Sequence, residues 1–225
     1  MPIWQLCANL LIPNCLRSNL SYSPLTALEL YVNSSIPELV KSLYQEQGYI
    51  CAYCMRRIPC KDRIGCELTK EDHRVEHIKP REVYPGLQLD YTNMVACCPG
   101  HIGDQEHCDR LKGKKEISFS PLDSAFISTL SYNKDGTIVS SNEQYNKEIN
   151  EVLNLNTKLL KLNRKQSWES VVTKLVANKG KQLNKAQIKQ YIEKYSSMHN
   201  KGGQMMYIPY CGVILYNLNK KLRKL

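Results

Sequence analysis

"NMVACCPGHIGDQEHCDRLKG", residues 93 to 113, places three cysteines and two histidines among turn-forming glycine and proline residues. A second cysteine pair, Cys51 and Cys54, lies upstream in "YICAYCMRR", residues 49 to 57. A two-residue spacing lets both thiolates of that pair reach one ion from a tight turn, and Cys98 and Cys108 can complete a tetrahedral set. The sequence therefore predicts a structural zinc site in which four thiolates close the coordination sphere.

Neighbouring residues leave alternatives to this ligand set. Cys97 could take the place of Cys98, and His101 or His107 could replace a cysteine. Buried free thiols are the other interpretation, but clustering beside glycine and proline turns favours a metal. The other five cysteines stand apart from the set: Cys60 and Cys66 have no assigned role, and Cys7, Cys15 and Cys211 are expected to be small core residues.

Cysteine usage and hydropathy together indicate the compartment. Seven of the ten cysteines lie between Cys51 and Cys108, and no stretch reaches the roughly 18 uninterrupted apolar residues that a membrane span requires. The first residues show neither the basic segment nor the cleavage site of a signal peptide. We therefore expect a cytoplasmic protein with no membrane partner, in which reduced cysteines bind metal instead of forming disulfides.

Positive charge is concentrated in the last third of the chain. Residues 151–225 hold 15 Lys and Arg against 3 Asp and Glu, a net +12, whereas residues 1–150 hold 16 against 18, a net −2. Such a basic region on a near-neutral body indicates nucleic acid or an acidic partner. The lysines expected to follow a nucleic-acid backbone are Lys181, Lys185 and Lys189.

The pattern along the chain divides it into an N-terminal helical segment (1–48), a cysteine-rich core (49–115) and a hairpin followed by a basic helical region (116–225). Gly48 is the expected stop of the last N-terminal helix. Short β pieces are expected around 74–78 and 94–97, a hairpin over "FISTLSYNKDGTIVSS" (126–141), and helices from Glu143 onward. One predicted helix carries an apolar face made of Ile188, Tyr191, Ile192 and Tyr195. The order of elements predicts the α+β class.

Four polar residues lie between or beside the two cysteine pairs: Glu76, His77, Asn93 and Asp109. Taken in order, "EH" in "RVEHIKPREVY" (74–84), "YTN" and "CDRLKG" resemble the HNH nuclease family, whose fold is a ββα-metal finger. The family usually carries Asn or His where this chain has Asp109, which leaves the metal preference open.

The resemblance implies a metal-dependent endonuclease that hydrolyses phosphodiester bonds of nucleic acid, with DNA as the expected substrate. Such hydrolysis needs a base, which an imidazole supplies at neutral pH, and a cation that neutralises charge on the phosphate. We therefore expect His77 to be the base, and Glu76 and Asp109 to bind one Mg²⁺ or Mn²⁺. Asn93 is expected to hold the hairpin loop and orient His77. Four residues are further expected to contact phosphates: Lys79, Arg81, Arg110 and Lys112.

A closer resemblance includes the flanking segments "QEQGYICAYC" and "LNLNTKLLKLNR". It is to the PtuB family, the HNH component of Septu-type and retron-associated anti-phage defence systems. That resemblance implies a partner ATPase of the ABC/SMC-like class (PtuA-type). The alternatives are a restriction-type or mobile-element HNH nuclease that acts alone, and a zinc-stabilised nucleic-acid-binding module without catalysis. His73 is expected to be a surface or structural residue.

Overall fold

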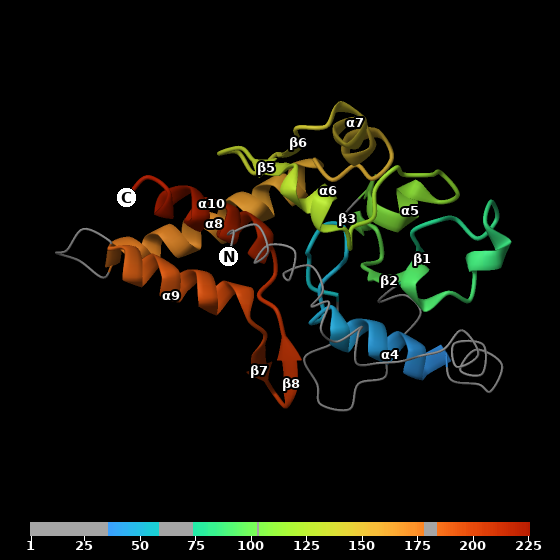
Figure 1. Cartoon of the computed structure of the whole chain (residues 1–225), viewed down its shortest axis with the longest axis horizontal. Helices are drawn as coiled ribbons and strands as arrows, with labels where there is room; N and C mark the ends of the chain where they lie inside the picture. The colour runs from blue at the N-terminus through green and yellow to red at the C-terminus, as the bar shows by residue number, and fades with distance from the viewer. Residues whose placement is uncertain (1–35, 59–73, 103, 178–183) are drawn as a thin grey trace.

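The computed structural model describes residues 36–58, 74–102, 104–177 and 184–225. This part of the chain is an α+β protein, as the sequence predicts, in which the strands pair as four separate two-stranded antiparallel sheets (Figure 1). The buried apolar side chains form one continuous cluster. Among the described helices, none combines the length and the apolar character needed to cross a membrane.

Some sequence predictions lie outside the described residues. They are the part of the N-terminal helical segment before residue 36, together with Cys7, Cys15, Cys60, Cys66, His73 and Lys181.

Helix α4 (Ile36–Glu46) is the described end of the predicted N-terminal helical segment. It buries Leu43 and Tyr44 on its apolar face. Directly after the helix, the Gln47 amide donates to the carbonyl of Ala96 at 2.8 Å and accepts from its N–H at 2.7 Å. This paired contact fixes the end of α4 against the strand that leads to the second cysteine pair, where both backbone groups are buried and need partners.

The two β pieces predicted beside the Glu-His pair form an antiparallel hairpin, β1 (Arg74–His77) with β2 (Met94–Cys97). Side chains alternate along a strand, so Glu76 and His77 face opposite sides of the hairpin. Glu76 is only 3% exposed, whereas His77 is half-buried. The connection between the strands contains two short 3-10 turns, η1 (Pro85–Leu87) and η2 (Tyr91–Asn93).

After β2 the chain makes a second, smaller hairpin and then one short helix. These elements are β3 (His101–Ile102), β4 (Gln105–Glu106) and α5 (Cys108–Lys112). Gly100 turns the chain between β2 and β3 with a φ of +79°, where a Cβ atom would lie 2.8 Å from the carbonyl oxygen of His107. Glycine is therefore required at this turn, which returns the chain to the cysteine cluster.

The predicted central hairpin is present but shorter than expected. Its strands are β5 (Leu130–Tyr132) and β6 (Ile138–Ser140), joined by a turn in which the Gly136 N–H donates to Asn133. The expected strand residues before Leu130 instead form helix α6 (Ser124–Ser128). The prediction was wrong there because the Asp123 carboxylate caps the N–H of Ala125 and starts a helix.

The rest of the chain is mainly helical, as predicted. The helices are α7 (Glu143–Glu151), α8 (Lys158–Ala177), α9 (Lys185–Ser196) and α10 (Cys211–Leu222). In α9, Ile188, Ile192 and Tyr195 are buried on one face and Tyr191 is half-buried, which confirms the predicted stripe. Cys211 is fully buried, as expected of a small core residue.

One hairpin in this region was not predicted. Strands β7 (His199–Lys201) and β8 (Gln204–Met206) interrupt the helices between α9 and α10. The two glycines at its tip, Gly202 and Gly203, both have positive φ, and a Gly-Gly pair between two short strands is a recognised hairpin signal. The hairpin was missed because its strand residues His199 and Asn200 are polar and do not show the alternating apolar pattern of a typical strand.

The elements are spread along the long axis of the molecule (Figure 1). The hairpin β1–β2 and helix α5 lie toward one end. The last turns of α8, the first turns of α9 and the C-terminal end of α10 lie together at the opposite end. The predicted site and the basic helices are therefore far apart.

Candidate functional site

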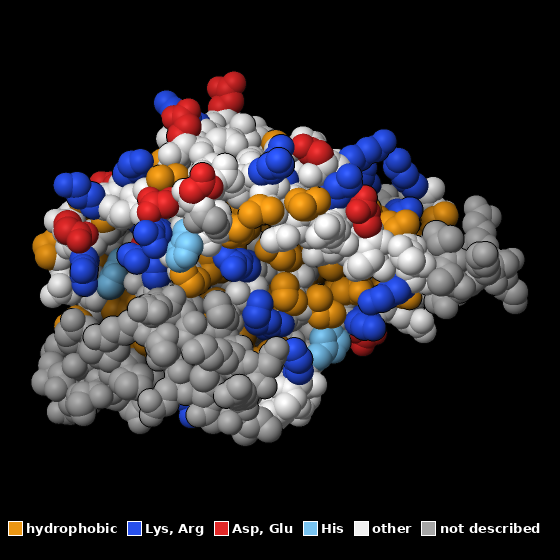
Figure 2. Space-filling model, turned by 180° about the vertical axis from the view of Figure 1, so that it is seen from behind, with side chains coloured by type: hydrophobic (Ala, Val, Ile, Leu, Met, Phe, Trp, Pro, Cys, Tyr) orange, Lys and Arg blue, Asp and Glu red, His pale blue; other side chains and the backbone are white. Residues whose placement is uncertain are grey.

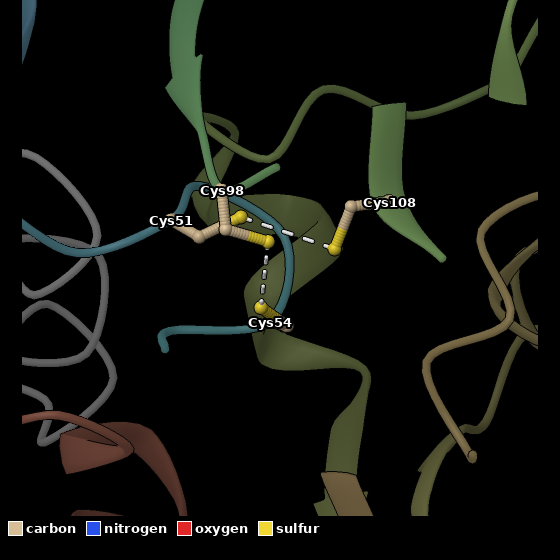
Figure 3. Close-up of side chains that lie close together, drawn as sticks. All are labelled: Cys51, Cys54, Cys98 and Cys108. Carbon is tan, nitrogen blue, oxygen red and sulfur yellow. Dashed lines mark hydrogen bonds between the residues drawn. The ribbon is translucent and has the colours of Figure 1, made fainter. Parts of the chain in front are cut away.

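Four cysteines gather into one buried cluster. Their sulfur atoms all lie within 4.8 Å of one another, with 3.9 Å between Cys51 and Cys108 and 3.8 Å between Cys54 and Cys98 (Figure 3). A tetrahedral zinc ion with bonds of about 2.3 Å requires sulfur atoms roughly 3.8 Å apart. The cluster therefore has the donors and the spacing to hold a metal ion such as zinc.

The backbone around each cysteine explains this convergence. In the first pair, the Met55 N–H donates to the Cys51 carbonyl at 3.0 Å, which closes the tight turn, and the Ala52 N–H donates to Ala96 in β2 at 3.1 Å. Cys98 follows directly after β2. Cys108 begins α5 with a φ of +56°, and its N–H donates to Leu153 at 2.8 Å. A turn, a strand end and a helix start thus bring distant segments to one point.

The thiols influence one another strongly. Burial by itself would raise the pKa of Cys51, but hydrogen bonds from Cys108 and the other cysteines lower it well below its ordinary value. The Cys108 hydrogen bond likewise lowers the pKa of Cys98 to about 7. Burial raises the pKa of Cys54 and Cys108. Within the cluster, Cys51 and Cys98 are therefore the thiols biased toward the thiolate, which is the form that binds metal.

The structure also bears on the alternatives for this ligand set. Cys98 belongs to the four-cysteine group, whereas Cys97 is buried within β2. His101 is exposed and lies 3.3 Å from Arg110. His107 is fully buried with its Nδ1 3.0 Å from the Cys108 sulfur, so it is placed to support a ligand rather than to replace one.

Two buried carboxyl groups form the second feature of the site. Glu76, on β1, is 3% exposed and Asp109, on α5, is 6% exposed. The pKa of Glu76 is raised to about 8, chiefly by burial and also by a hydrogen bond and the negative charge of Asp109, while Lys112 acts in the opposite direction. Tyr53, within the first cysteine turn, donates to Glu76 at 2.8 Å. Paired carboxylates are oxygen donors of the kind that Mg²⁺ and Mn²⁺ prefer, so their chemistry fits such an ion.

Two basic residues neutralise these carboxyl groups, and the sequence analysis missed this role. Arg74 forms an ion pair with Asp109, and the Lys112 ammonium lies 2.7 Å from Glu76 and donates to the His77 carbonyl at 3.1 Å. Lys112 was expected to contact phosphates, but its side chain is fully buried and cannot do so in this structure. Local spacing indicates only that Arg74 shares a strand face with Glu76 and that Lys112 shares a helix face with Asp109, whereas the observed partners lie across the two elements.

His77 ends β1, with its side chain on the face of the hairpin opposite to that of Glu76. Its Nε2 lies 2.9 Å from the backbone carbonyl of Gln88. A carbonyl oxygen only accepts hydrogen bonds, so Nε2 carries the proton and Nδ1 keeps its lone pair. Within the described residues, His77 does not join Glu76 and Asp109 in a compact three-residue metal group.

Asn93 holds the loop between β1 and β2 closed. Its side-chain oxygen accepts from the Lys79 N–H at 2.8 Å, and its amide donates to the carbonyls of Lys79 and Leu87 at 3.0 and 3.2 Å. The backbone carbonyl of Asn93 also accepts from Ile78 at 2.9 Å. These bonds clamp the residues directly after His77 and hold the loop closed.

The remaining predicted contact residues occupy different surfaces. Lys79 lies over the Tyr84 ring at 5.5 Å, Arg81 is exposed beside Glu82, and Arg110 pairs with Glu106 at 2.6 Å. The two described lysines of the basic region, Lys185 and Lys189, are exposed on α9. The structure thus leaves the first turns of α9, which carry these lysines, at the end of the molecule opposite to β1, β2 and α5 (Figure 1). A scan of the chain against protein-family models finds no match, and a search of the curated proteins finds none either.

Proposed function

We propose that this chain is a metal-dependent endonuclease of the HNH type that hydrolyses phosphodiester bonds of nucleic acid, with DNA as the expected substrate. The observation that carries the proposal is the buried Glu76–Asp109 carboxyl pair, with His77 as the next residue of the same strand and its Nδ1 without a hydrogen bond to the described residues. Perturbed carboxyl groups next to a candidate base are typical of active sites.

The local architecture supports the same proposal. The β1–β2 hairpin is followed by α5, which is the ββα order that the resemblance implies, and four cysteines connect its parts. Zinc held by those cysteines would be structural, because four thiolates leave no open position for a substrate. Cys108 and Asp109 are adjacent in α5, so fixing the cysteine also fixes the carboxylate.

Each residue then has a role in hydrolysis. A divalent ion held by Glu76 and Asp109 would neutralise negative charge on the phosphate and on the leaving oxygen. The free Nδ1 of His77 takes the proton from the attacking water. Lys112 and Asn93 do not touch the reacting atoms; they position the His77 backbone and the loop that follows it. Lys79 and Arg81, on that loop, are available for phosphate contacts.

From the resemblance to the PtuB family we propose that this nuclease acts in an anti-phage defence complex with an ABC/SMC-like ATPase. This part of the proposal rests on the flanking motifs alone. Co-expression with the neighbouring gene and purification through one affinity tag tests it. Recovery of an ATPase of that class in stoichiometric amount supports the defence role, whereas an active nuclease with no such partner supports a restriction-type or mobile-element enzyme.

One observation favours a second candidate function, a zinc-stabilised binding module without catalysis. Arg74 and Lys112 already neutralise both carboxyl groups, and a buried ion-pair network can be purely structural. In that case the chain would bind nucleic acid and leave it intact.

Cleavage assays with a matched pair of histidine variants distinguish these functions. Plasmid, single-stranded DNA and structured RNA are incubated with Mg²⁺ or Mn²⁺ and either wild type, His77→Ala or His199→Ala. His199 is the control because it too is half-buried with Nε2 bonded to a backbone carbonyl, that of Lys194 at 2.6 Å. We expect His77→Ala to lose at least about a hundredfold in rate, as removal of a general base does, and His199→Ala to retain activity. Equal activity of the two variants would remove His77 from the mechanism.

A further inference from the structure

The last quarter of the chain is almost free of acidic residues. Residues 170–225 contain 11 Lys and Arg and a single acidic residue, Glu193. The fold collects many of these cations at the end of the helical bundle remote from the carboxyl pair (Figure 1). Seven of them are exposed there: Lys174, Lys185, Lys189, Lys220, Lys221, Arg223 and Lys224. We call this group the basic end.

The chain path explains why they meet. Helices α8 and α9 are joined by a short connection, so the end of α8 lies beside the start of α9. Helix α10 packs against both helices and returns to the same end. Figure 2, in which this end lies on the right, shows Lys and Arg side chains gathered along the upper edge there.

Helix stability does not account for all of these positions. Lys220 and Lys221, in the last turn of α10, complement the negative end of the helix dipole. Lys185 and Lys189 are in the first two turns of α9, where the dipole disfavours a cation, and the first turn contains no acidic residue. Within the described part of the chain, these two lysines form no ion pair. An outside anion is the partner they lack.

The length of α8 sets the distance between the two ends. Leu153 accepts a hydrogen bond from the backbone of Cys108 at 2.8 Å, and α8 begins five residues later and runs away from the cysteine cluster for 20 residues. At about 1.5 Å per residue this helix is roughly 30 Å long. A duplex rises by about 3.4 Å per base pair, so the separation corresponds to about nine base pairs.

We propose that the basic end is a second nucleic-acid contact, which holds the phosphates of a duplex arm about nine base pairs or more from the bond cleaved beside His77. This inference rests on the proposed nuclease function and adds to it that the substrate has a double-stranded arm. Six of the seven cations are lysines. Lysine is depleted at the cores of protein interfaces but acts as a point charge toward phosphate, so the composition suits nucleic acid better than a protein partner.

A binding experiment tests the contact itself. The full-length, zinc-loaded His77→Ala protein is titrated with a fluorescent duplex of roughly 24 base pairs, long enough for both ends, at several salt concentrations. The test variant adds Lys185→Gln and Lys189→Gln. The matched control adds Lys134→Gln and Lys158→Gln, which remove the same charge from exposed positions; Lys158 also begins a helix. Circular dichroism confirms that both variants are folded.

We expect the test variant to lower the slope of log affinity against log salt by up to about 1.8, or about 0.9 for each lost phosphate contact, and the control to keep the wild-type slope. Equal slopes in the two variants overturn the proposal. The proposal is also overturned if the test variant keeps the wild-type salt slope but no longer co-purifies with an acidic protein that wild type binds. That result would assign the basic end to protein docking.

A cleavage experiment separates this inference from the proposed function. Wild-type protein is given substrates with one cleavage site and a duplex arm whose length increases from about 4 to about 16 base pairs. We expect the cleavage rate to rise sharply near nine base pairs in wild type and much less in Lys185→Gln/Lys189→Gln. Cleavage that is independent of arm length overturns the second contact and leaves the nuclease assignment standing. If no substrate is cut while the salt slopes differ as expected, the basic end holds and the proposed nuclease function fails.

Discussion

Because Glu76 loses its proton as the pH rises, the stability of the folded protein should fall over the same pH range. In the folded protein the pKa of Glu76 is about 8, compared with an ordinary value of 4.5, because of burial and the nearby Asp109 carboxyl. A group whose pKa is raised by folding contributes stability that is fully present below the ordinary pKa and is lost as the pH rises through the folded value. The loss should therefore occur between about pH 5 and pH 8.

The expected size follows from this difference in pKa. A rise of this size corresponds to about 5 kcal/mol, since a tenfold change in proton affinity is worth about 1.4 kcal/mol. This is an upper value, because Asp109 and Lys112 belong to the same network and share the change in charge. Replacement by glutamine keeps the shape of the side chain and removes the titration. Glu76→Gln should therefore show a flatter dependence of unfolding free energy on pH than wild type.

Urea unfolding of zinc-loaded wild type and Glu76→Gln, in buffers without any other divalent ion, measures this difference. Thiol titration is common to both proteins and cancels in the comparison. We expect wild type to lose about 2 to 5 kcal/mol relative to the variant between about pH 5 and pH 8. Added Mn²⁺ should restore wild type at the upper end of this range, because the ion replaces the proton at the carboxyl pair. Parallel curves would refute the reasoning, and so would a wild type that gains stability relative to the variant.

Three further perturbations test the rest of the site. Cys54→Ser should lose zinc and become protease-sensitive, because structural zinc contributes on the order of 10 kcal/mol to folding; Cys97→Ser is the control and should keep one zinc per chain by metal analysis. Lys112→Met should lower the unfolding free energy by about 3 kcal/mol, since it removes one partner of a buried pair with Glu76, and unchanged urea stability would contradict this. Asp109→Ala should lower Mn²⁺ affinity by about tenfold or more with a folded, zinc-loaded chain, so equal Mn²⁺ titration curves for variant and wild type would exclude it as a ligand.

Local spacing in the sequence determined much of this protein. The two-residue gap between Cys51 and Cys54 is a turn geometry, and the stripe from Ile188 to Tyr195 is a helix period, so each is encoded within a few positions. The β pieces beside the Glu-His pair are confirmed for the same reason. The α6 helix and the β7–β8 hairpin were missed because a cap and a glycine pair outweighed the propensity of the residues around them.

Only the tertiary structure decided which charges are buried and which ends meet. Lys112 has the sequence signature of a surface lysine, but the packing of α5 against β1 encloses it and pairs it with Glu76, 36 positions earlier in the chain. The choice of Cys98 over Cys97 depends on where β2 ends relative to a turn more than 40 residues away. Charge counting detected a basic region but could not place it at the far end of α8, because its position depends on the length and direction of that helix, which is roughly 30 Å long. Burial, pairing and distance are properties of segments that meet only in the folded chain, whereas spacing is a property of the chain itself.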